Sequence, residues 1–141
     1  MTANVLLVED EPNIAGIILY KLRREGHVVA HATTAAGARA LSGRWDLVLL
    51  DSSLPGEDSL ALLTELRQQG PVAVMTESRD ESTPGVALEL GATAIVRKPF
   101  KPTLLARLVL ELTSPKGDAN HSAEGRGGEL IPSMPIPEVF G

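Results

Sequence analysis

Apolar residues gather in five short runs along the first two thirds of the chain. The strands predicted from these runs are 5–8, 27–31, 46–50, 72–75 and 94–96. Most of the runs are continuous rather than alternating, which is typical of strands that are buried on both faces of a parallel sheet. Gly, Pro or polar turn residues separate them, so each run is predicted to be a strand of its own.

A segment with helical spacing or helix-forming composition follows each run. Helices are predicted from Pro12 to just before Gly26, at about 35–41, across 60–66, from Pro84 to just before Gly91, and across 104–112. The last of these has apolar residues at i, i+1, i+4, i+5 and i+8, which form one clean face. Asp10 is expected to cap the first helix, because a carboxylate just ahead of Pro12 can accept the free backbone N–H groups.

Five strand–helix units in about 112 residues predict an α/β fold. The expected architecture is a five-stranded parallel sheet of order 2-1-3-4-5 with helices on both faces, a flavodoxin-like (αβ)5 sandwich. Residues 1–112 form this predicted domain. Nine of the 29 residues in 113–141 are Gly or Pro and no periodic pattern remains, so this segment is predicted to be a flexible tail.

Composition narrows the possible functions of the 141-residue chain. Its net charge of −5 offers no basic surface for nucleic acid, so no direct nucleic-acid binding is expected. The absence of cysteine excludes disulfides, thiolate metal sites and cysteine nucleophiles. No apolar run is long enough for a membrane span or signal peptide, so a cytoplasmic protein without membrane association is expected.

Polar residues follow four of the five predicted strands. Glu9 and Asp10 come after the first strand, Asp51 after the third, Thr76 after the fourth and Lys98 after the fifth. Each has an ordinary explanation by itself, as a cap, a turn residue or a surface charge. In a 2-1-3-4-5 sheet, however, the first and third strands are neighbours, so the three carboxylates would lie together on loops at one edge.

Three neighbouring carboxylates repel one another unless a cation offsets their charge. Mg²⁺ suits a site that offers a few carboxylates, several waters and a phosphate. A lysine ammonium group and a threonine hydroxyl beside such a site can bind phosphoryl oxygens. No Gly-rich phosphate loop is present, and the remaining candidate acceptor is Asp51 itself, as a nucleophile that forms an acyl phosphate.

Five separated motifs resemble the receiver domain of two-component response regulators over residues 4 to 112. They are Val5-Leu6-Leu7-Val8-Glu9-Asp10-Glu11, Leu49-Leu50-Asp51 with Leu54-Pro55-Gly56, Thr76, Gly91-Ala92 and Lys98-Pro99-Phe100. The resemblance implies that Asp51 accepts a phosphoryl group from a phosphohistidine kinase. It also implies that Glu9, Asp10, Asp51 and the backbone carbonyl of Ser53 hold Mg²⁺.

The resemblance assigns the remaining site residues as well. Thr76 and Lys98 would bind the phosphoryl group, and the peptide bond before Pro99 would be cis. The family usually has an aromatic residue three positions before the lysine, where its ring moves together with the threonine. Ile95 stands there in this chain, so Thr76 and Ile95 form the expected switch pair. Glu77 follows Thr76 where the family usually has a small residue.

The function expected from this resemblance is a stand-alone response regulator receiver that changes partner binding through its fourth helix, fifth strand and fifth helix. Its partners would be a sensor histidine kinase or phosphotransfer protein and an unknown output protein, with the chain a monomer or weak homodimer. It would not be an enzyme beyond Mg²⁺-dependent self-phosphorylation and autodephosphorylation at Asp51. Glu77 and Ile95 favour one alternative, a phosphorylation-independent interaction module. A metal-dependent phosphohydrolase is a third possibility, disfavoured because Ser53 stands where a second acid would be needed.

Overall fold

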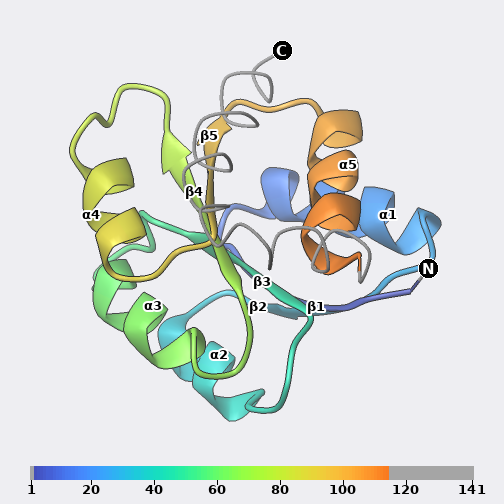
Figure 1. Cartoon of the computed structure of the whole chain (residues 1–141), viewed down its shortest axis with the longest axis horizontal. Coiled ribbons are helices and arrows are strands. Elements are labelled where there is room, and N and C mark those ends of the chain that lie inside the picture. The colour runs from blue at the N-terminus through green and yellow to red at the C-terminus, as the bar shows by residue number, and fades with distance from the viewer. Residues whose placement is uncertain (1, 115–141) are drawn as a thin grey trace, which may run out of the picture.

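The computed structural model describes residues 2–114, which form one layered α/β domain (Figure 1). The strands are β1 (Asn4–Val8), β2 (Val28–Ala32), β3 (Leu47–Asp51), β4 (Val72–Glu77) and β5 (Ala94–Lys98). The helices are α1 (Pro12–Arg24), α2 (Ala35–Ala40), α3 (Ser59–Leu66), α4 (Thr83–Glu89) and α5 (Pro102–Thr113). All ten predicted elements are present in the expected order.

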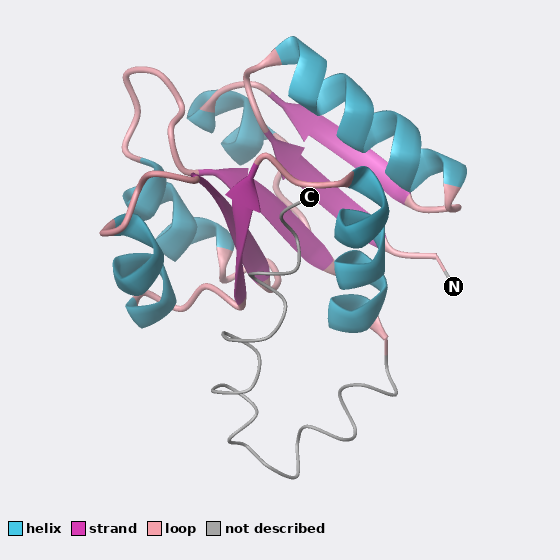
Figure 2. Cartoon of the chain, turned by 90° about the horizontal axis from the view of Figure 1, so that it is seen from above, coloured by secondary structure: helices cyan, strands magenta, loops and turns pink. Residues whose placement is uncertain are grey.

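The five strands form one parallel sheet of order β2-β1-β3-β4-β5, which confirms the predicted fold class. Figure 2 shows the sheet between two layers of helices. Alternate residues of each central strand enter different cores. In β3, Leu47 and Leu49 pack with α1 and α5, whereas Val48 and Leu50 pack with α2, α3 and α4. Burial on both faces explains why the strands read as continuous apolar runs.

Three strands extend past their last apolar residue and carry the polar site residues. Asp51 was expected on a loop, but it is the final residue of β3 and lies opposite Met75 of β4. In the same way, β4 continues through Glu77 and β5 through Lys98, and these two residues lie opposite each other. Backbone pairing with the neighbouring strand does not depend on side-chain polarity, so the pairing continues beyond the apolar run.

The cap of α1 differs from the prediction. Glu11, rather than Asp10, is the N-cap residue, and its side chain accepts hydrogen bonds from the amides of Asn13 and Ile14. Asp10 is therefore left outside the helix. At the other end of α1, Gly26 has a φ of 97°, the left-handed conformation that glycine adopts without strain after a helix.

The predicted boundary between domain and tail falls within α5, which continues through Thr113. The rest of the predicted flexible tail, from residue 115 onward, lies outside the described residues, so its flexibility stays a prediction. Within residues 2–114, none of the helices combines the length and apolar character that a membrane crossing needs.

Candidate functional site

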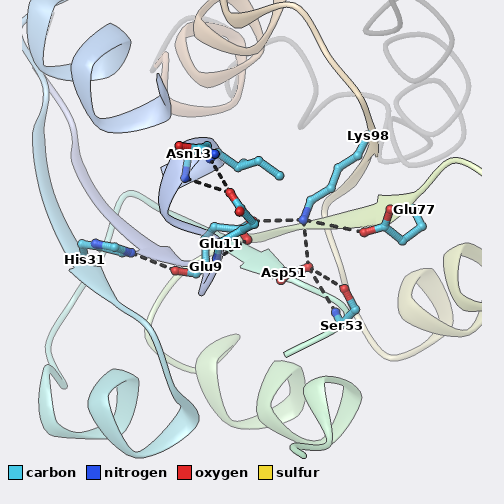
Figure 3. A network of polar contacts seen from close by, with 9 residues as sticks. Glu9, Glu11, Asn13, His31, Asp51, Ser53, Glu77 and Lys98 are labelled. Atoms are coloured by element: carbon cyan, nitrogen blue, oxygen red, sulfur yellow. Dashed lines mark hydrogen bonds and ion pairs between the residues drawn. The ribbon is translucent and has the colours of Figure 1, made fainter. Parts of the chain in front are cut away.

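The predicted site residues meet at the carboxyl-terminal edge of the sheet. Glu9 and Asp10 follow β1, while Asp51, Thr76 and Lys98 belong to the ends of β3, β4 and β5. In a parallel sheet, all strands end at the same edge, so residues far apart in the sequence become neighbours there. Figure 3 shows Lys98 reaching in from β5 towards Glu9 and Asp51.

Glu9 is fully buried and tied to the protein through its backbone and its side chain. Its amide donates to the carbonyl of Ala32 at 3.1 Å, and its Oε2 accepts from the amide of Glu11 at 3.1 Å. The carbonyl oxygen of Glu9 lies 2.9 Å from Nε2 of His31. A carbonyl can only accept, so Nε2 of His31 carries the proton. Two residues of β2 therefore fix the orientation of Glu9 at the end of β1.

Asp51 is buried, and its carboxylate is held through one oxygen. Oδ1 accepts from the amide of Ser53 at 3.1 Å and from its hydroxyl at 3.2 Å. The ammonium group of Lys98 donates to the same oxygen at 3.2 Å. These contacts involve the Ser53 amide and hydroxyl. That the Ser53 carbonyl is a metal ligand stays a prediction.

Lys98 is the cation at the centre of this site. Its Nζ lies 3.1 Å from Oε1 of Glu9 and 3.2 Å from Oδ1 of Asp51, and all three side chains are buried. Burial by itself lowers the pKa of Lys98, but the two carboxylates outweigh it and hold the pKa above its usual value. Lys98 therefore stays charged and balances part of the negative charge at the sheet edge.

A third carboxylate, Glu77, approaches Lys98 from β4. Its Oε2 lies 3.9 Å from Nζ, and its side chain is 58% exposed, unlike those of Glu9 and Asp51. Figure 3 shows Glu77 reaching towards Lys98 from the side opposite Glu9. This contact is long and solvent-accessible, so it is the weakest of the three.

Glu9, Asp10 and Asp51 form a cluster that fits a divalent cation. One carboxylate oxygen from each residue lies within 4.8 Å of the others. Burial raises the pKa of Glu9, and the neighbouring Asp51 carboxylate raises it further. Partial burial and the same neighbour also raise the pKa of Asp10. Carboxylates crowded in this way are stabilised by an oxygen-binding cation such as Mg²⁺, and this donor set suits it.

Thr76 offers an unused hydroxyl at the same edge. Its side chain is fully buried, and its Oγ1 has no hydrogen-bond partner among the described residues. Buried hydroxyl groups are normally paired, so this hydroxyl is available to bind a ligand at the carboxyl-terminal edge of the sheet. Ile95, the other member of the expected switch pair, is also fully buried and packs in the core beneath α3 and α4.

An apolar groove opens beside Lys98, on the α1 side of the site. It has a volume of about 380 Å³ and is lined by Ile14, Ile17, Glu77, Ser78, Lys98, Pro99, Phe100 and Pro102. The peptide bond between Lys98 and Pro99 is cis. The groove joins an exposed part of α1, where Ile17 is 51% exposed, to the loop between β5 and α5.

The sequence matches one domain family over most of its length. The family model for the response regulator receiver domain matches residues 5–110. The chain belongs to this family. Receiver domains are parts of two-component response regulators, so the family assignment also places this chain in that class of signalling proteins.

Two curated relatives show how this receiver relates to longer regulators. The alkaline phosphatase synthesis transcriptional regulatory protein PhoP of Bacillus subtilis (strain 168) is 31% identical over 144 residues, which cover 99% of this chain and 60% of PhoP. The aerobic respiration control protein ArcA of Escherichia coli (strain K12) is 36% identical over 119 residues, which cover 79% of this chain and 50% of ArcA. The chain thus spans about half the length of the curated relatives it matches.

Solved structures agree with this assignment. NtrX from Brucella abortus has a TM-score of 0.74 and is 32% identical, with 86% of this chain and 30% of NtrX covered. The Francisella response regulator 1452 receiver domain has a TM-score of 0.72 and is 25% identical, with 81% of this chain and 98% of that domain covered. The sheet order and the two helical layers are therefore those of a receiver.

Two contacts at the site were not predicted from the sequence. His31 had no predicted role, yet its Nε2 donates a hydrogen bond to the backbone carbonyl of Glu9. Glu77 was expected to favour a phosphorylation-independent module, but its approach to Lys98 was not predicted, because that contact depends on how β4 and β5 pair. Both contacts join residues on neighbouring strands. No local sequence signal reports them, although a correct strand register would have placed both residues at the site edge.

Proposed function

We propose that this receiver accepts a phosphoryl group on Asp51 from a phosphohistidine of a sensor histidine kinase or phosphotransfer protein. The observation that carries the proposal is the unpaired, buried hydroxyl of Thr76 beside a buried lysine–carboxylate cluster. A phosphoryl group on Asp51 would supply the acceptor oxygens that Thr76 lacks. The match to the response regulator receiver domain over residues 5–110 supports the proposal, because the resemblance to that family implies phosphorylation at Asp51.

The proposed transfer is a displacement at phosphorus. A carboxylate oxygen of Asp51 forms a bond to phosphorus while the bond to the donor imidazole nitrogen breaks, and the imidazole leaves with the bonding electron pair. The Ser53 amide and hydroxyl orient the Asp51 carboxylate through Oδ1. Lys98 and Thr76 bind oxygens of the transferred group. Mg²⁺, held by Glu9, Asp10 and Asp51, would neutralise the negative charge that gathers there.

The groove beside Lys98 is the proposed docking place for the phosphodonor. It is largely apolar, with Ile14, Ile17 and Phe100 among its lining residues, and it opens next to the site. An apolar groove of this kind can receive one face of an amphipathic helix. A helix that carries the phosphohistidine could therefore pack on α1 and the loop after β5 while presenting its phosphoryl group to Asp51.

The proposed output is a change in partner binding at α4, β5 and α5. Lys98 belongs to β5, and movement of Lys98 and Thr76 towards a phosphoryl group would shift the end of the sheet between α4 and α5. Val86 on α4 and Leu110 on α5 are exposed apolar side chains that a partner could cover. Ile95 lies beneath this surface in the core, so an aliphatic side chain would transmit the change.

Intact-protein mass spectrometry tests the proposal directly. The protein is incubated with Mg²⁺ and acetyl phosphate or phosphoramidate, and Asp51→Ala serves as the matched control. We expect one added phosphoryl group on the wild type and none on Asp51→Ala. Steady turnover of an unrelated phosphoester would instead indicate a metal-dependent phosphohydrolase.

A phosphorylation-independent interaction module is the second candidate function. The Glu77 carboxylate favours it, because a negative charge of the chain itself already lies 3.9 Å from the lysine that is proposed to bind the phosphoryl group. Ile95 also favours this alternative, because it is a buried aliphatic side chain at the position where the family usually has an aromatic ring that moves. A protein that binds Mg²⁺ but gives no adduct with either donor would support this alternative.

A further inference from the structure

Glu77 stands at the mouth of the proposed phosphoacceptor site without a structural role of its own. It is the last residue of β4 and lies opposite Lys98 in the β4–β5 register. In the described part of the chain its carboxylate accepts no hydrogen bond, and Lys98 at 3.9 Å is its one close charged partner. An exposed carboxylate held only this loosely contributes little to folding.

The position of Glu77 matters because of what surrounds it. Glu77 lines the same apolar groove as Ser78, Lys98 and Phe100, and this groove is the proposed docking place of the phosphodonor. In the proposed function, oxygens of the incoming phosphoryl group bind to Lys98, and Glu77 lies 3.9 Å from this lysine. A negative charge at this point repels an anionic donor and competes with it for the lysine.

We infer that Glu77 is a specificity-determining charge gate, which disfavours small, highly anionic phosphodonors and favours phosphohistidine presented by a protein docked in the groove. The Glu77 carboxylate repels a small phosphodonor anion, and no docked protein offsets this repulsion. A docked protein donor excludes water from the groove and can place a hydrogen-bond donor or cation against Glu77. This inference rests on the proposed function, because it concerns phosphorylation of Asp51.

The expected effect follows from the charge of one carboxylate. Two unit charges 4 Å apart in water interact strongly enough to change a rate by about fivefold. Glu77→Gln keeps the size of the side chain and removes its charge. It should therefore raise the rate of phosphorylation by acetyl phosphate about three- to tenfold at low ionic strength. The gain should be smaller with the less negatively charged phosphoramidate and should shrink in high salt, where exposed charges are screened.

The experiment measures the rate at which the phosphorylated mass appears, in the 141-residue chain at saturating Mg²⁺. Wild type, Glu77→Gln and Glu77→Ala are compared with both donors at low and high salt. Glu89→Gln is the matched control. Glu89 ends α4 at the opposite edge of the sheet, and its substitution removes the same charge as Glu77→Gln. A purely structural effect of residue 77 would not depend on donor charge or on salt.

The outcomes separate the gate from the proposed function. Faster phosphorylation of Glu77→Gln and Glu77→Ala, dependent on donor and salt and absent in Glu89→Gln, would support the gate. Equal rates in wild type and Glu77→Gln would overturn the gate and leave the proposed function intact. An equal gain in Glu89→Gln would also overturn it, because net charge would then explain the effect. Failure of every variant to form an adduct would overturn the proposed function and the gate together.

Discussion

Replacing Lys98 with methionine tests the electrostatic design of the site. Methionine has a similar length and no charge, so Lys98→Met leaves Glu9 and Asp51 buried without their cation. The structure gives the two ion pairs N–O distances of 3.1 and 3.2 Å, with all three side chains buried. We expect a large loss of stability that depends on pH and on Mg²⁺.

The magnitude follows from these distances. With an effective dielectric constant near 20, each pair contributes about 5 kcal/mol of attraction, and dehydration of the lysine offsets several kcal/mol of that sum. Removal of one partner from a buried ion pair typically lowers the free energy of unfolding by about 3–5 kcal/mol. Lys98→Met should therefore be less stable than wild type by about 3 kcal/mol or more at pH 8 without Mg²⁺.

The loss should become smaller at low pH. Burial and the Asp51 carboxylate raise the pKa of Glu9 above the ordinary value of 4.5, and removal of Lys98 raises it further. A folded carboxyl with a raised pKa binds its proton more tightly than the unfolded chain does. Stability therefore falls as pH rises from about 4.5 towards the folded pKa. The deficit of Lys98→Met relative to wild type should therefore be smaller at pH 5 than at pH 8.

Urea unfolding at pH 5 and pH 8, with and without Mg²⁺, measures these differences. Mg²⁺ at a hundredfold excess over its Kd should stabilise either protein by about 2.7 kcal/mol, and Lys98→Met should bind it more tightly because no lysine competes. Lys101→Met, which removes an exposed lysine from the same loop, is the matched control and should change little. An equal deficit at both pH values, unaffected by Mg²⁺, would refute the electrostatic account and leave only lost packing of the lysine stem.

Three further outcomes are expected. Thr76→Val should raise the free energy of unfolding by about 1 kcal/mol, because it removes a buried unpaired hydroxyl. The same substitution should slow phosphorylation about tenfold or more, whereas Thr76→Ser should keep the wild-type rate of phosphorylation. His31→Ala should weaken Mg²⁺ binding about tenfold in calorimetry, with His31→Gln largely retaining it; unchanged affinity would exclude a positioning role. The acyl phosphate on Asp51 should be lost rapidly, because Ser53 and Ser78 are small and admit water, and an adduct that survives many hours with Mg²⁺ would contradict this.

The candidate site was largely predictable because the fold places strand ends together. Because each central strand is apolar on both faces, the sequence predicted five strands in a parallel sheet. The expected strand order then predicted the edge of the sheet where Glu9, Asp51 and Lys98 meet. The cap of α1 was not predictable in the same way. Asp10 and Glu11 both precede Pro12, and either could have capped the helix. Which of them caps α1 and which joins the acid cluster depends on the neighbouring strand, which brings Asp51 close to Asp10.

The sequence by itself determined the layered fold, the acid cluster and the positions of the lysine and threonine that we propose bind the phosphoryl group, because these depend on hydrophobic pattern and on residues at strand ends. Only the tertiary structure decided which side chains contact each other across neighbouring strands. It placed His31 against the carbonyl of Glu9 and Glu77 within 3.9 Å of Lys98. Such contacts arise from strand register and side-chain direction, which link residues that no local pattern connects.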